Sequence, residues 1–344
     1  MSLMSKIRVG IIGCGSIAKH RHMPEYANNE HTEITAVCDI VEERAQEFAE
    51  KYEATAFTNY EELLQNADVD AVSVCTPNYL HAPVSIAALQ AGKHVLCEKP
   101  MATSREDALA MIEAAKQSNK KLMIAHNQRF VPSHQKARQL IENGEAGKIY
   151  SFRTAFGHGG PEGWSADGKD SWFFKKEQAF IGAMGDLGVH KTDLLRYILG
   201  EEFVEVGAFV ETSAKQNTDV DDTAVCVLKT ESGIIGTLAA SWSYVSKEDN
   251  STIIYGENAI LRLEDDPVHS LVVQYKNGEV VKYELGGIQT NESGGQTNTQ
   301  VIDQFITAII DDQQPLVTGE EGLKSLQVVL SALESNETKR ITSV

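Results

Sequence analysis

The sequence is poor in the features that mark several large classes of protein. Its five cysteines are an odd number and include no C-x-x-C pair, so the pattern indicates a reducing compartment rather than a disulfide framework. No apolar run is long enough to span a bilayer, and the first residues lack the apolar core of a secretory signal peptide. We therefore expect a cytoplasmic protein without a membrane partner.

Basic residues are also scarce. The chain has 31 Lys and Arg against 49 Asp and Glu, a formal net charge of -18. Binding to nucleic acid requires clustered Lys and Arg, and anionic lipid surfaces attract the same residues, so neither partner is expected. A negatively charged small substrate remains compatible, because one pocket can be locally basic. A length of 344 residues with 42% hydrophobic content is sufficient for two globular domains.

The first third of the chain alternates short apolar runs with amphipathic stretches. Helical spacing of apolar residues predicts helices over 42–52, 82–91 and 105–118, with Pro83 in the first turn of its helix and Ser104 as an N-cap. Strands that alternate with helices indicate parallel βαβ units. The predicted buried strands are 8–12, 34–38, 71–75, 95–97 and 122–125.

The pattern changes after Ala125. A further helix is predicted over 132–141, and the chain then becomes rich in alternating segments typical of an antiparallel sheet with one covered face. Two helices close the chain, near 299–310 and 322–335, and 286–297 has the composition of a loop. The predicted strands of this sheet are 149–156, 204–211, 223–230, 234–243, 259–263, 271–275 and 280–285.

A glycine pattern lies between the first predicted strand and the segment after it. In Gly13-x-Gly15-x-x-Ala18, the first glycine permits a tight turn, the second lets the backbone approach a pyrophosphate, and the alanine keeps the next helix close to the sheet. The alternative is a strand-to-helix turn with incidental glycines. The cofactor contacts expected here are Gly13, Gly15, Ser16, Ile17 and Ala18.

Asp39 lies 21 residues after Ala18, at the end of the second predicted strand. A carboxylate there accepts hydrogen bonds from the adenosine ribose and repels a 2′-phosphate, and Ile40 and Val41 offer no cation to bind one. The cofactor prediction is therefore NAD rather than NADP. A turn carboxylate without a cofactor role is the alternative.

Two loops follow neighbouring strands at the same edge of the predicted sheet. Because ligands of open parallel sheets bind beyond the carboxyl ends of strands, the loop after Cys75 is placed to touch the nicotinamide ribose, or else its side chains only cap the next helix. In the next loop, Lys99 is either a proton donor at a partly dry site or a surface lysine paired with Glu98. The cofactor contacts expected from the two loops are Thr76, Pro77, Asn78, His81 and Glu98.

Asp186 and His190 are four residues apart. If 187–199 is helical and ends at Gly200, both side chains share one face near the helix start. A histidine that titrates near neutral pH can take a hydroxyl proton while the carboxylate orients it. Zinc lacks a convincing third ligand and an H-x-x-x-H pair, so no metal is expected, and a carboxylate beside a core histidine is the structural alternative.

Taken in order, these motifs resemble the glucose–fructose oxidoreductase / inositol dehydrogenase (Gfo/Idh/MocA-type) family. They are the glycine cradle, Asp39, Cys75-Thr76-Pro77-Asn78 with His81, Glu98-Lys99-Pro100, and Asp186-x-Gly188-x-His190. Arg129-Phe130-x-Pro132 and Gly319-Glu320-Glu321-Gly322 extend the resemblance over nearly the whole chain.

The resemblance implies an α/β Rossmann domain over 4–125 that binds NAD(P). It also implies a substrate-binding and oligomerisation α+β domain over 126–344, with a large, mainly antiparallel open sheet that forms homodimers or homotetramers. Lys99 and His190 are implied to flank the reacting carbon with Asp186 beside them, and these three are the expected catalytic residues. The implied substrate-binding residues are Asn127, Arg129, His158 and Trp172.

The activity implied by the resemblance is NAD-dependent oxidation of a secondary alcohol on a sugar, polyol or cyclitol. Two other functions stay open. One is a glycoside hydrolase or lyase that retains NAD and uses transient oxidation, and the other is a non-catalytic NAD sensor. Net NADH formation from sugars or inositols would favour the dehydrogenase over the hydrolase or lyase and over the sensor.

Overall fold

The computed structural model describes residues 6–288, 290 and 298–344, which fall into two compact units. The first unit holds the described residues of 1–126, 164–168 and 289–323, and the second holds 127–163, 169–288 and 324–344. The change of pattern predicts a single boundary after residue 125, whereas the first unit also includes two later segments. Residues 289 and 291–297 of the predicted loop lie outside the described residues.

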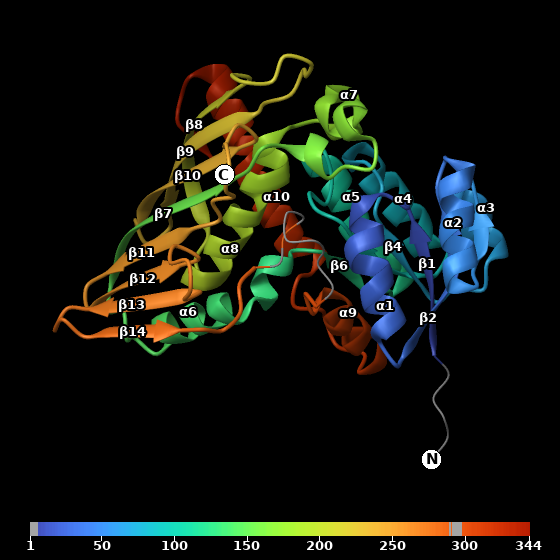
Figure 1. Ribbon diagram of the computed structural model, residues 1–344, viewed down its shortest axis with the longest axis horizontal. Coiled ribbons are helices and arrows are strands. Elements are labelled where there is room, and N and C mark those ends of the chain that lie inside the picture. Colours follow the sequence, from blue (N-terminus) through green and yellow to red (C-terminus); the bar gives the residue numbers. More distant parts are fainter. Residues whose placement is uncertain (1–5, 289, 291–297) are drawn as a thin grey trace. The chain divides into compact units, whose positions relative to one another are not determined.

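The first unit is built on a parallel sheet (Figure 1). Within the described residues it has six strands in the order β3-β2-β1-β4-β5-β6. Since β1 pairs with β2 on one side and with β4 on the other, the strand order reverses at β1, where open α/β sheets bind ligands. The strands are β1 Ile7–Ile12, β2 Thr32–Cys38, β3 Thr55–Phe57, β4 Ala71–Val74, β5 His94–Cys97 and β6 Leu122–Ile124.

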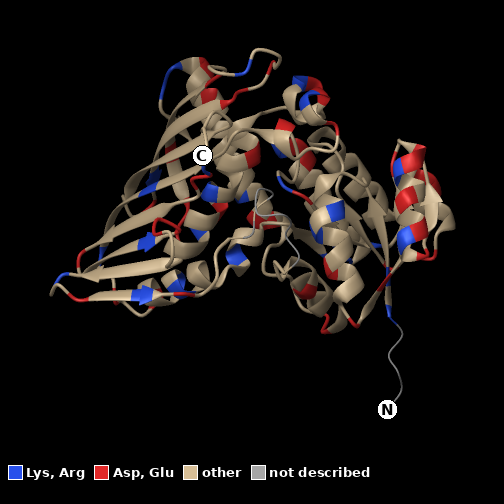
Figure 2. Ribbon diagram, in the orientation of Figure 1, with Lys and Arg blue, Asp and Glu red and all other residues tan. Residues whose placement is uncertain are grey.

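The helices of this unit follow the predicted periodicity closely. The bounds predicted for α2 and α5 are confirmed, and the Ser104 hydroxyl accepts a 3.0 Å hydrogen bond from the Asp107 amide as an N-cap. Pro83 was expected in a first turn but lies inside α4, because that helix begins directly after Pro77, at Asn78. The helices are α1 Met23–Asn28, α2 Glu42–Tyr52, α3 Tyr60–Asn66, α4 Asn78–Gln90, α5 Arg105–Ser118 and α9 Val301–Ile310, and α10 Gly319–Thr338 begins here. Figure 2 shows acidic and basic residues gathered along α2.

The second unit has a mainly antiparallel sheet (Figure 1). In the described part of the chain its nine strands run in the order β14-β13-β12-β11-β7-β10-β9-β8-β15, and only β7 and β10 pair in parallel. This sheet and the Rossmann-type sheet confirm the predicted fold class. The strands are β7 Ile149–Gly157, β8 Phe203–Glu211, β9 Thr223–Thr230, β10 Ile235–Ser241, β11 Thr252–Gly256, β12 Ala259–Leu263, β13 Leu271–Tyr275, β14 Val280–Tyr283 and β15 Thr342–Ser343.

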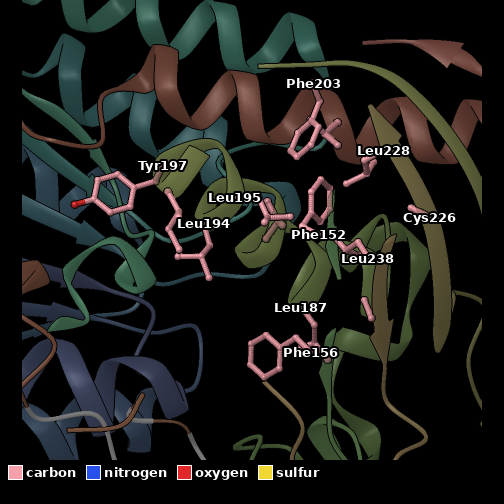
Figure 3. Packing of buried hydrophobic residues seen from close by; sticks show 14 of the residues in the cluster. Phe152, Phe156, Leu187, Leu194, Leu195, Tyr197, Phe203, Cys226, Leu228 and Leu238 are labelled. Carbon is pink, nitrogen blue, oxygen red and sulfur yellow. The ribbon is translucent and has the colours of Figure 1, made fainter. Parts of the chain in front are cut away.

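One face of this sheet is covered by helices, as the alternation in the sequence predicts. Buried and more exposed residues alternate along β9, and α6 (Pro132–Glu142) and α8 (Val189–Leu199) pack against one another. Figure 3 shows the core beneath α8, where the Phe152 and Phe203 rings meet edge to face with centroids 5.9 Å apart. Helix α8 is thereby fixed on the sheet, and it carries His190 at its second position.

Candidate active site

The glycine cradle has the geometry that its sequence predicts. Gly13 has φ +93°, and a Cβ there would lie 2.5 Å from the Cys75 carbonyl oxygen, so no other residue fits. A Cβ on Gly15 would meet no atom within 4 Å, which leaves room for a ligand to approach the backbone. The helix after the cradle begins as a π-helical turn, Ala18–His22, before α1, which differs from the expected regular helix.

Asp39 holds the cradle from the end of β2. Its carboxylate accepts hydrogen bonds of 2.9 Å from the backbone amides of Cys14 and Val41. Arg44 approaches the same carboxylate, with Nη1 3.6 Å from Oδ2. Ile40 and Val41 offer no cation, as expected, but Arg44 in the first turn of α2 supplies one that was not expected from the sequence.

His81 ties together the loops that follow β4 and β5. Its Nδ1 lies 2.7 Å from the Pro100 carbonyl oxygen, and its Nε2 lies 2.8 Å from that of Thr76. Burial outweighs these carbonyls and lowers the pKa of His81 to about 4. The neutral imidazole has one N–H, so His81 donates to the carbonyl of one loop and packs against the carbonyl of the other. The buried Thr76 Oγ1 has no hydrogen-bond partner among the described residues, so this hydroxyl fits a role in binding a cofactor hydroxyl or amide at this edge.

Glu98 is part of a buried polar network. Its carboxylate pairs with Arg21 and accepts a 2.8 Å hydrogen bond from His22 Nε2, and the backbone amide of Lys99 donates to it at 3.2 Å. All three partners of the network, Arg21, His22 and Glu98, are almost fully buried. Glu98 therefore orients the backbone that presents Lys99. The sequence predicted a cofactor contact for Glu98 and gave no sign of Arg21 or His22.

In the second unit, a buried aspartate holds the segment that carries Asp186. The Asp221 carboxylate accepts hydrogen bonds from the amides of Gly182 at 2.7 Å and Met184 at 2.8 Å. Burial raises the pKa of Asp221 to about 6. Asp221 has no signal in the sequence, because it lies 37 and 39 residues from the two amides that it binds.

Asp186 lies in a π-helical turn, and His190 lies in the α-helix that follows it directly. The expected α-helix from Leu187 is wrong at its start, since Met184–Gly188 forms a π-helical turn and α8 begins at Val189. Trp242 Nε1 donates to Asp186 Oδ2 at 3.2 Å, and the His190 ring lies 5.7 Å from that of Phe156. Both residues are buried, and the Trp242 and Phe156 rings beside them limit the access of water. Trp242 is a further site residue without a sequence signal.

The four residues expected to bind substrate all lie in the second unit. Arg129 donates from Nε and Nη2 to Asp193 at 2.8 and 2.7 Å, so its guanidinium joins the turn 127–130 to α8. Asn127 is buried in the same turn. His158 Nδ1 accepts a hydrogen bond from the Gly160 amide at 2.9 Å. The Trp172 and Phe173 rings are stacked, with their centroids 3.9 Å apart. These contacts give Arg129 a clear role in the fold.

Lys191, next to His190, is a fully buried cation. Its Nζ donates to the Asn250 carbonyl oxygen at 2.8 Å and lies 5.8 Å from the Phe156 ring centroid. Burial lowers the pKa of Lys191 from 10.5 to about 7. The unfolded chain therefore binds more protons than the folded one between these values, so this group makes the free energy of unfolding rise with pH.

Replacement of Lys191 by methionine should remove that rise. Between roughly pH 7 and 8.5, we expect the free energy of unfolding of the wild-type protein to rise by about 1 kcal/mol per pH unit relative to that of Lys191→Met. In this window the unfolded wild-type chain binds up to one proton more than the folded protein. Urea unfolding of both proteins at the two pH values measures this difference. Lys176→Met, at an exposed position, is the control. Parallel pH dependence of wild type and Lys191→Met would contradict a depressed pKa at this site.

Two family models match the chain. One, described as an oxidoreductase family with an NAD-binding Rossmann fold, matches residues 7–126, and the GFO/IDH/MocA C-terminal domain matches residues 134–262. Together they cover most of both units.

Curated relatives and solved structures agree with this match. Levoglucosan dehydrogenase of Pseudarthrobacter phenanthrenivorans is 32% identical over 69% of this chain and 68% of its own length. Myo-inositol 2-dehydrogenase of Thermotoga maritima is 29% identical over 97% of each chain. A structure of levoglucosan dehydrogenase with NADH superposes with a TM-score of 0.85 at 26% identity, over 99% of both chains.

Metal and membrane features are not evident in the described part of the chain. There, no group of three or more His, Cys, Asp or Glu residues is arranged to hold a metal ion. Across the same residues, none of the helices combines the length and hydropathy of a membrane span.

Proposed function

This chain belongs to the Gfo/Idh/MocA oxidoreductase family, whose first domain is an NAD-binding Rossmann fold, and we propose that it oxidises a secondary alcohol of a sugar or cyclitol. The matches of the two family models carry this proposal. The open space at Gly15, where a pyrophosphate can approach the backbone, agrees with it. The names of the relatives support the substrate class, since they include dehydrogenases of levoglucosan, myo-inositol and D-glucosides.

Bound NAD would supply the hydride acceptor, and the residues of the chain would take up the proton. Gly13 and Gly15 would hold the pyrophosphate, Asp39 the adenosine ribose, and Thr76 the nicotinamide end. Oxidation converts a CH–OH group to a carbonyl, releasing one hydride and one proton. We assign acceptance of the hydroxyl proton to His190, four residues after Asp186, and to the Lys99 ammonium the stabilisation of the negative charge that develops on oxygen.

A panel of sugars and inositols tests the proposal. Purified protein with NAD and each compound is followed by NADH absorbance, and turnover on at least one sugar or cyclitol is the expected result. Tight NAD binding with no turnover on any of them would count against the substrate class. Glycoside cleavage without net NADH would instead indicate the hydrolase or lyase mode.

The open face of the second sheet supports assembly with further copies of the chain. Phe209 on β8 and Val225 on β9 are direct cross-strand partners and are 70% and 47% exposed, and Val227 and Ile235 extend the apolar surface. Contiguous exposed apolar surface of this kind marks an interface. The proposed occupant is the same face of another copy, in a homodimer or a homotetramer.

A charge introduced in this face should separate the copies. We expect Phe209→Glu to separate the copies that meet through this face, converting a dimer to monomers or a tetramer to dimers, because a carboxylate buried at a symmetric contact meets its own copy. Light scattering after size exclusion measures the mass. Glu211→Gln, two residues along the same face of β8, is the control that should retain the oligomer. A monomeric wild-type protein would contradict the proposal.

A further inference from the structure

A turn from the middle of the chain belongs to the cofactor-binding unit. Residues 164–168 lie in the first unit, although the residues on both sides of them belong to the second. The Ser16 hydroxyl donates to the Trp164 carbonyl oxygen at 2.6 Å, and Arg44 Nη2 donates to Asp167 Oδ1 at 2.9 Å. The turn is closed by a 3.1 Å bond from the Gly168 amide to the Ser165 carbonyl.

These two attachment points mark the two ends of the adenosine diphosphate site. Ser16 is in the cradle that receives the pyrophosphate. Arg44 lies beside Asp39, whose carboxylate stands at the end of β2 where a dinucleotide ribose binds. The turn 164–168 therefore reaches the ribose end of the site, and Asp167 is the side chain that it brings there.

Arg44 is the residue on which the choice of dinucleotide depends in this geometry. A guanidinium is planar and binds a phosphate through two parallel hydrogen bonds. In this protein one end of it contacts Asp167 and the other faces Asp39, at 2.9 and 3.6 Å. Two carboxylates thus pair with the guanidinium that would otherwise attract a phosphate on the adenosine ribose.

We infer that Asp167 is a specificity-determining residue that disfavours a 2′-phosphorylated dinucleotide. It does so by holding Arg44 in an ion pair and by adding a second negative charge near the ribose. A 2′-phosphate has to break that pair and approach both carboxylates, whereas an unmodified ribose does neither. The inference concerns binding of the dinucleotide alone and does not depend on which alcohol is oxidised.

Direct binding of NADH and NADPH to the full chain tests this role. Asp167→Asn keeps the size of the side chain and removes its charge, so we expect NADPH to bind about tenfold more tightly and NADH to change by less than about threefold. Dissociation constants from titration calorimetry measure both, without any turnover. The NADPH gain should shrink as salt is raised, because the affected charges are partly exposed.

Two further variants separate this role from a general charge effect. Asp170→Asn removes the same charge three residues along, at an exposed position, and should leave the NADPH constant within about threefold. Arg44→Gln combined with Asp167→Asn should abolish the gain, because the gain needs the released guanidinium. An Asp167→Asn protein with unchanged NADPH affinity, or one in which the double variant keeps the full gain, would overturn the inference. A chain inactive on every sugar would still give these binding results.

Discussion

Replacing Lys99 by methionine is expected to lower kcat about 10³-fold while NADH affinity changes by less than about threefold. The ammonium is assigned to the negative charge that develops on oxygen, and the loss of one such stabilising donor typically costs a factor of about 10² to 10³ in kcat. Steady-state kinetics on the best substrate of the panel gives kcat, and fluorescence titration gives the NADH constant.

Lys93 provides a matched control for this variant, because the two lysines flank the same strand. Lys93 precedes β5 and donates to the Val69 carbonyl oxygen at 2.8 Å, whereas Lys99 follows β5 in the loop supported by Glu98. Lys93→Met should keep kcat within about threefold of wild type. A kcat for Lys99→Met within tenfold of wild type would remove Lys99 from the reaction.

Among the glycine-to-alanine substitutions in the second unit, Gly182→Ala is expected to be the most destabilising. A Cβ at Gly182 would lie 1.8 Å from the Asp221 carbonyl oxygen and 2.9 Å from Val220 Cγ2, so the backbone itself has to move. That movement also disturbs the hydrogen bonds that the Gly182 and Met184 amides donate to the Asp221 carboxylate, which hold the turn that carries Asp186. We expect a loss of about 3 kcal/mol, or a fall in Tm of about 6 °C or more, together with loss of activity.

Thermal unfolding followed by circular dichroism measures this effect. Gly163→Ala adds the same methyl where no atom lies within 4 Å, so its Tm should match that of wild type. If both variants melted together with wild type, the close contact between Gly182 and Asp221 would not exist in the protein.

The sequence predicts this fold well wherever periodicity has one explanation. β9 and β12 have the predicted bounds because alternating apolar residues leave one covered face. β11 has the composition of a strand, Thr-Ile-Ile-Tyr-Gly, but was not predicted, and it is stabilised by pairing with β7 and β12. α3 was missed as well, a helix of seven residues capped by Asn59.

The site shows a sharper limit of sequence reasoning. The motif residues are recognisable because they follow strands and glycines in a fixed order. Their supports are not recognisable, since Arg21 is 77 residues from Glu98 and Asp221 is 39 from Gly182. A tertiary contact of that length leaves no local pattern, and the same holds for Asp167 beside Arg44.

Transfer of deuterium tests the central claim most directly, namely that a hydride passes from an alcohol carbon to the nicotinamide. A substrate from the panel, deuterated at the carbon that bears the reacting hydroxyl, is incubated with the protein and NAD. We predict NADH heavier by one deuterium, detected by mass spectrometry. Product formed while the NADH pool remains unlabelled, or deuterium released to water, would contradict it.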